Sequence, residues 1–174
     1  MNPRARLGGH GLAGIFGILC GLAIASPALA GFEFANWGMT VDQVISASNG
    51  TAVQVRDDKN KRIQDKLRLA SGRTNLDGVS YTLDYFFEPK TKGLALINFV
   101  PAKTDCDAAL SAHKSRLGTP MEKRKESVIQ PGKPPLVQVE YEWSGGFLGS
   151  DKVSGVDVSV KEMGIRYCQF LRTG

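Results

Sequence analysis

The chain has 174 residues, of which 22 are basic and 17 acidic, so its formal net charge is +5. This length is enough for one domain with a hydrophobic core of ordinary size. A charge excess this small favours solubility and gives no argument for a nucleic-acid partner.

Residues 1–30 have the pattern of a secretory signal peptide. Two arginines precede the apolar run 12–25, and small residues stand before the expected cleavage site after Ala30. The alternative is an uncleaved anchor, since residues 11–30 have the length of a membrane span. Pro27 favours cleavage. The mature protein is then expected to be a single domain, residues 31–174, that is periplasmic or secreted and has no stable membrane span.

Removal of this leader also changes the chemistry that is available. The net charge falls to about +3, and His113 becomes the one remaining histidine. The remaining cysteines, Cys106 and Cys168, have one intramolecular pairing, and an oxidising compartment favours a disulfide between them. Two separate buried thiols are the alternative.

Two helices are predicted from their start and stop signals. Thr40 and Gln43 form a capping box before a short apolar face that ends at Gly50. The second helix starts near Thr104, carries Cys106 and His113 on its apolar face, and ends at Gly118.

Strands are predicted wherever apolar and polar residues alternate. They are expected at 79–88, 94–100, 137–143, 156–161 and 165–171, with a weaker strand at 122–130. The mixed charges of Arg56–Arg73 indicate a solvated loop or an edge strand. A Gly-rich loop near residue 145 contains Phe147 and Leu148.

This order of elements predicts an α+β fold in which two helices pack on one face of an antiparallel sheet. Each half contains a capped helix followed by strands, which indicates a duplicated helix-plus-meander unit with half-repeats 31–102 and 103–174. An ordinary α+β chain without duplication has the same pattern and stays as the alternative.

One pair of carboxylates could support hydrolysis. Glu140 and Glu142 lie on the same face of one predicted strand, roughly 7 Å apart, a separation within the range used by glycosidases. Their neighbour Gln138 favours a plain solvent face instead. His113 has apolar neighbours on its helix, so neither a catalytic residue, a metal site nor a cofactor is predicted.

A short motif near the start of the predicted domain resembles a known group of proteins. Trp37-Gly38-Met39-Thr40, followed by Val44 and Gly50, is similar to the opening of small bacterial envelope proteins. These are the outer-membrane-assembly small lipoproteins and the β-lactamase-inhibitor-protein-like domains, and Leu117-Gly118-Thr119-Pro120 resembles the end of their helical part. The resemblance implies a helical segment on an antiparallel meander and a role in binding other proteins.

The sequence therefore predicts a monomeric, non-catalytic binding or envelope-accessory module. Its expected partner is another envelope protein or an anionic envelope component, held on the sheet face that the helices leave uncovered. The candidate contact residues are Arg62, Lys66, Arg68, Phe147 and Leu148. A small periplasmic hydrolase that uses Glu140 and Glu142 is the alternative.

Overall fold

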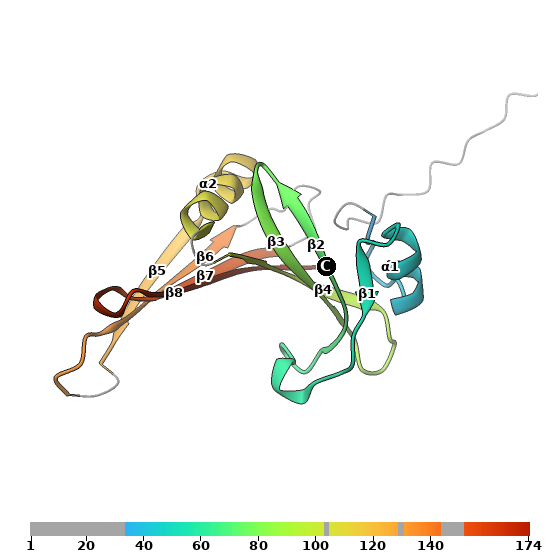
Figure 1. The fold of residues 1–174 in the computed structure, drawn as a ribbon, viewed down its shortest axis with the longest axis horizontal. Coiled ribbons are helices and arrows are strands. Elements are labelled where there is room, and N and C mark those ends of the chain that lie inside the picture. Colours follow the sequence, from blue (N-terminus) through green and yellow to red (C-terminus); the bar gives the residue numbers. More distant parts are fainter. Residues whose placement is uncertain (1–33, 103–104, 129–130, 144–151) are drawn as a thin grey trace, which may run out of the picture.

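The computed structural model describes residues 34–102, 105–128, 131–143 and 152–174, which form one eight-stranded antiparallel sheet with two α-helices (Figure 1). The strand order is β1-β2-β3-β4-β8-β7-β6-β5. The predicted signal peptide, residues 1–30, lies outside the described residues. The helices are α1 (Val41–Ala47) and α2 (Cys106–Leu117), with 3₁₀ turns η1 (Lys59–Lys61) and η3 (Lys161–Met163). The strands are β1 (Ala52–Gln54), β2 (Leu67–Leu76), β3 (Val79–Phe87), β4 (Leu94–Pro101), β5 (Met121–Ser127), β6 (Leu136–Trp143), β7 (Lys152–Val160) and β8 (Ile165–Thr173).

The predicted fold class, an α+β fold built from two helices packed on a sheet, is wrong, because the sheet dominates the molecule and the two short helices do not form a layer over it. Helix α1 has seven residues and buries only Val44, and α2 buries the small side chains Cys106 and Ala109. The large buried side chains come from the central strands instead. They include Tyr81, Leu83, Tyr85, Ile97, Phe99 and Phe170. The strands therefore supply most of the hydrophobic core.

The charged segment Arg56–Arg73 is also more ordered than its composition predicts. Its last residues belong to β2, an interior strand that pairs with β1 on one side and β3 on the other. The chain entering β1 packs closely against Gly72 of β2. A Cβ atom added to Gly72 would lie 2.7 Å from the carbonyl oxygen of Thr51. A three-residue strand has too few positions to show alternation, which is why its sequence gives no signal.

Helix α1 begins as the capping box predicts. The Thr40 backbone N–H donates to the Gln43 side chain at 2.8 Å, and the Gln43 N–H donates to the Thr40 hydroxyl at 3.4 Å. The helix ends at Ala47 with Ser48 as its C-cap, and the chain then turns through Asn49 at φ 50° and the predicted stop residue Gly50 at φ 85°. These local signals fix both ends of α1.

The two halves of the chain have the same order of elements. Helix α1 precedes the meander β1–β4, and α2 precedes the meander β5–β8. They meet where β4 pairs with β8 and Phe99 lies opposite Phe170. Figure 1 shows the sheet bent into an arch, with α2 above one limb and α1 outside the other. Duplication of one ancestral unit stays a prediction.

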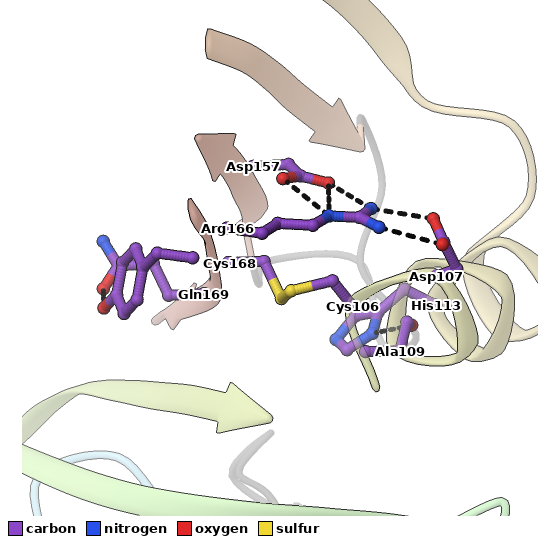
Figure 2. Close-up of a disulfide and its surroundings, with 9 residues drawn as sticks. Cys106, Asp107, Ala109, His113, Asp157, Arg166, Cys168 and Gln169 are labelled. Carbon is purple, nitrogen blue, oxygen red and sulfur yellow. Dashed lines mark hydrogen bonds and ion pairs between the residues drawn. A yellow bond between two sulfur atoms is a disulfide. The ribbon is translucent and has the colours of Figure 1, made fainter. Parts of the chain in front are cut away.

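Helix α2 is fastened to the sheet at its amino-terminal end. The predicted disulfide between Cys106 and Cys168 is confirmed, with the two Cα atoms 5.9 Å apart (Figure 2). Beside it, the Arg166 guanidinium bridges Asp107 of α2 at 2.7 Å and Asp157 of β7 at 2.6 Å. One covalent bond and one bridging arginine thus hold a helix that buries little apolar surface.

Candidate functional site

A cavity of about 1020 Å³ lies on the sheet face opposite the helices. Alternation along β7 distinguishes the two faces: Asp157 lies opposite Cys168 on the helix side, whereas Ser154 and Val156 project to the other side and line the cavity. We call this side the helix-free face. The other lining side chains include Gln64, Lys66, Glu88, Met121, Lys123, Gln138, Glu140, Glu142, Lys152, Gln169 and Leu171.

One row of side chains crosses the helix-free face from edge to edge. Successive cross-strand pairs run through Val53, Ser71, Asp84, Asn98, Leu171, Ser154, Glu142 and Met121. The two end residues are exposed and apolar, and most positions between them are polar. At the usual strand spacing the row is roughly 34 Å long. A surface of this length suits a macromolecular partner better than a small molecule.

Charges of both signs line the cavity. The Lys125 ammonium lies 2.8 Å from Glu140, and the Gln138 amide donates to the same carboxylate oxygen at 2.8 Å. The Lys125 hydrogen bond is the main cause that lowers the pKa of Glu140, so this carboxylate is ionised at neutral pH. Glu142 and Lys123 line the same cavity. Neither residue forms an ion pair with any of the described residues.

A polar network continues the helix-free face across β2, β3 and β4. The Arg68 guanidinium and the Ser71 hydroxyl both lie 2.7 Å from the Asp84 carboxylate. On β4, the Asn98 amide donates to Gln169 of β8 at 3.4 Å. The Arg68 Nε and the Asn98 Oδ1 are buried and have no hydrogen-bond partner within the described residues. Unsatisfied groups of this kind are uncommon in native proteins and call for an explanation.

A tight turn brings two more side chains to the rim of the cavity. Ile63 and Lys66 form an isolated bridge, and the Lys66 N–H donates to the Ile63 carbonyl at 3.0 Å. The two residues between them, Gln64 and Asp65, have φ of 49° and 61°, which costs energy in residues other than glycine. This turn places Gln64 and Lys66 beside Glu88, whose carboxylate lies 3.4 Å from the Lys66 ammonium.

The predicted contact residues are only partly brought together. Lys66 lines the cavity, and Arg68 lies on the same face but is half-buried against Asp84. Arg62 pairs with Asp57 outside the cavity. That hydrogen bond lowers the pKa of Asp57 and raises that of Arg62. Phe147 and Leu148 lie outside the described residues.

Sequence reasoning missed most of the residues that line the cavity. Met121, Lys123 and Lys152 were not proposed, because their strands are highly charged or weakly patterned. The alternation of residues along each strand could have shown which side chains share a face. It could not have shown that β5 and β7 belong to one sheet. The carboxylates Glu140 and Glu142 were proposed together, and both line the cavity.

The histidine of α2 lies on the other side of the sheet. Its ring stacks on Phe170 with the centroids 4.0 Å apart, and its Nδ1 donates to the Ala109 carbonyl at 2.9 Å. Burial is the main cause that lowers the pKa of His113. Gly155 permits this arrangement, since a Cβ there would lie 2.7 Å from the Phe170 ring. His113 is thus a core residue.

The chain matches no protein-family model, no curated protein and no solved structure. The resemblance to small bacterial envelope proteins therefore stays a prediction. Among the described residues, no group of three or more His, Cys, Asp or Glu side chains could hold a metal ion. None of the described helices has the length and apolar character needed to cross a membrane.

Proposed function

We propose that this chain is a non-catalytic binding module of the periplasm, which holds another envelope protein against its helix-free face. The observation that carries this proposal is the cavity of about 1020 Å³ in that face, with charges of both signs and exposed apolar Met121 at its edge. Protein interfaces commonly combine an apolar anchor with unpaired charges that a partner complements.

The export part of the proposal rests on two features. The amino-terminal leader pattern predicts secretion, and a disulfide between Cys106 and Cys168 is expected to persist only in an oxidising compartment. A periplasmic location fits both features.

The charges of the cavity favour binding over catalysis. A glycosidase needs one carboxyl group that stays protonated near neutral pH and can act as the acid. Lys125 and Gln138 stabilise the ionised form of Glu140, so Glu140 is unsuited to the acid role in such a pair. The one histidine of the predicted mature chain is on the opposite side of the sheet, stacked on Phe170.

Site-specific photo-crosslinking tests which face binds the partner. A photoreactive residue at Ser154 would project from the helix-free face, whereas one at Ser159 of the same strand projects from the helix side. The crosslinking is done in cells that have the protein's native envelope. There we expect one discrete adduct from position 154 and none from position 159. Equal labelling from both positions would contradict the proposal.

Charge reversal on β5 compares a residue that lines the cavity with its neighbour on the other face of the same strand. Lys123 lines the cavity, whereas the adjacent Arg124 lies on the other face of β5 and pairs with Glu126. Lys123→Glu together with Glu142→Lys should abolish the adduct from position 154, and Arg124→Glu should leave it unchanged. An adduct that survives the first pair would exclude this cavity as the interface.

A hydrolase remains a second candidate because both Glu140 and Glu142 line the cavity. It predicts that Glu140→Gln or Glu142→Gln abolishes cleavage of envelope glycan fragments by the purified protein while the crosslink persists. The binding module predicts no cleavage by either form, and a weaker crosslink in Glu142→Gln.

A further inference from the structure

A second surface of the molecule lies at the ends of two hairpins, next to one end of the cavity. The end of β5, the start of β6 and the β7–β8 turn lie at the same end of the sheet (Figure 1). Of the six exposed large apolar side chains among the described residues, four lie here. They are Val128 (66% exposed), Met163 (61%), Ile165 (47%) and Tyr167 (40%). We call this surface the hairpin end.

The polarity of the hairpin end changes in steps along the strands. The outermost row on the helix-free face contains Leu136, Val160 and Ile165, with Val160 directly opposite Ile165. The next row contains Lys125, Gln138, Val158 and Tyr167, joined by successive cross-strand pairs. The two rows are about 7 Å apart, because they are separated by two residues of strand.

Basic side chains surround the apolar tips. The described residues of 123–137 and 158–165 contain five basic side chains and two acidic ones. The basic ones are Lys123, Arg124, Lys125, Lys133 and Lys161, and the acidic ones are Glu126 and Glu162. Glu126 is paired with Arg124, Lys125 is paired with Glu140, and Lys123 lines the cavity. Lys133 and Lys161 therefore lie nearest the two turns, with Glu162 as the acidic residue beside them. The hairpin end is therefore both apolar and cationic.

We propose that the hairpin end docks on the surface of an anionic lipid bilayer. Interfacial segments bury apolar side chains about 5–10 Å deep, at the boundary between headgroups and acyl chains. The distance between the two rows matches this depth, so Met163 and Ile165 would enter the acyl boundary while Tyr167 and Lys125 reach the headgroups. Met163 lies in the β7–β8 turn and Ile165 at the start of β8, so these exposed side chains stand at the tip of the hairpin, where a flat bilayer surface can reach them.

Vesicle flotation tests this proposal with the full exported protein. We expect the protein to float with vesicles of phosphatidylglycerol and phosphatidylcholine in equal parts, and to stay in solution with phosphatidylcholine alone. Each lysine near an anionic surface contributes roughly a fivefold increase in partitioning. Lys133→Gln with Lys161→Gln should therefore reduce binding more than tenfold, and salt should weaken the binding of the unchanged protein.

The apolar contribution has a control of equal exposure. Met163→Ser with Ile165→Ser should reduce partitioning more than tenfold. Val53→Ser removes a side chain that is 59% exposed on β1, at the far edge of the sheet, and should have no effect on flotation. All variants change exposed residues, so circular dichroism should show an unchanged fold.

The acidic residue of the β7–β8 turn provides a gain-of-binding test. Glu162→Gln removes a charge that the headgroups repel, and should increase partitioning severalfold. The proposal is overturned if the protein does not float with anionic vesicles, or if the hairpin-end and control variants lose binding equally. It is also overturned if the Met163 and Ile165 changes convert a dimer to a monomer without affecting flotation, because a second copy would then cover this surface.

Discussion

The side chain of His113 is held in its neutral form by the residues around it. Its ring stacks on Phe170 and also contacts the rings of Tyr81 and Trp143, while Nδ1 donates to the Ala109 carbonyl. A neutral imidazole loses little in this position because its N–H is satisfied. A charged imidazolium would lose its hydration, which is the main reason that the pKa falls below 6.5.

This lowered pKa predicts a stability that depends on pH. Below about pH 6.5 the unfolded chain binds a proton at His113 before the folded chain does, so the free energy of unfolding falls as the pH falls. Urea denaturation at pH 7.5 and pH 5.5 should show a lower midpoint at the acidic pH. Within the described residues the carboxylates with lowered pKa values lose their contributions only at more acidic pH, below about 5.

The variant His113→Gln is the control for this effect. Glutamine does not titrate, so its urea midpoint should change much less between the two pH values, whatever its absolute stability. If the original protein and the variant respond equally to pH, His113 does not cause the dependence.

At the scale of elements, α2 depends on its connections to the sheet rather than on burial. Its connections include the Cys106–Cys168 disulfide, the Arg166 bridge, the stacking of His113 on Phe170 and a hydrogen bond from Trp143 Nε1 to the Gly118 carbonyl at 2.8 Å. The Arg166 hydrogen bonds also lower the pKa of Asp107. The sequence of α2 alone does not explain why the helix stays on the sheet.

Loss of the disulfide should therefore be costly. It closes a loop of 62 residues, and in the chain-entropy model removing it costs roughly 4 kcal/mol. Cys106→Ser with Cys168→Ser should lower the free energy of unfolding by about that amount in urea denaturation. A reducing agent should produce the same loss in the original protein and no further loss in the double variant, and a loss below about 1 kcal/mol would contradict this account.

At the scale of the whole molecule, the two halves share one core. Phe99 of β4 lies opposite Phe170 of β8 at the junction, and both are buried. Arg116 of α2 pairs at 2.6 Å with Asp77, which lies in the turn between β2 and β3 of the other half. Neither half can bury its last strand without the other.

We therefore expect the two halves to unfold together. Differential scanning calorimetry should show one transition whose calorimetric and van't Hoff enthalpies agree. Phe99→Ala should lower the stability of the whole molecule by about 3–5 kcal/mol and still give one transition. Val53→Ser, at an exposed edge position, is the control that should change little, and two separate transitions would show that the halves are independent.

Local signals in the sequence predicted several elements well. The capping box of Thr40 and Gln43, the alternation of residues 79–87 and the pairing of Cys106 with Cys168 are all present in the structure. The predicted balance between helices and sheet was wrong, because the apolar stripe of each helix is too small to form a layer. Strand β1 and the interior position of β2 were missed, since three residues show no period and β2 follows a highly charged segment without a regular apolar alternation of its own.

The sequence could predict which face of the sheet holds the candidate site, but it could not predict which residues line that site. Alternation along one strand shows which side chains share a side, so Glu140 and Glu142 could be grouped from the sequence. Lys66 and Met121 are far apart in the chain, and only the strand order brings them to one cavity. Arg62 was predicted as a contact residue from its charge alone. In the structure it pairs with Asp57 and does not line the cavity.

The sequence by itself determined the leader pattern, the ends of α1 and the pairing of the two remaining cysteines, because each depends on neighbouring residues or on simple counting. Tertiary structure alone decided that β4 pairs with β8, and so joined the two meanders into one arched sheet. That pairing is non-local and depends on the fit of Phe99 against Phe170, which no short window of sequence contains. The cavity of the helix-free face exists because of this pairing.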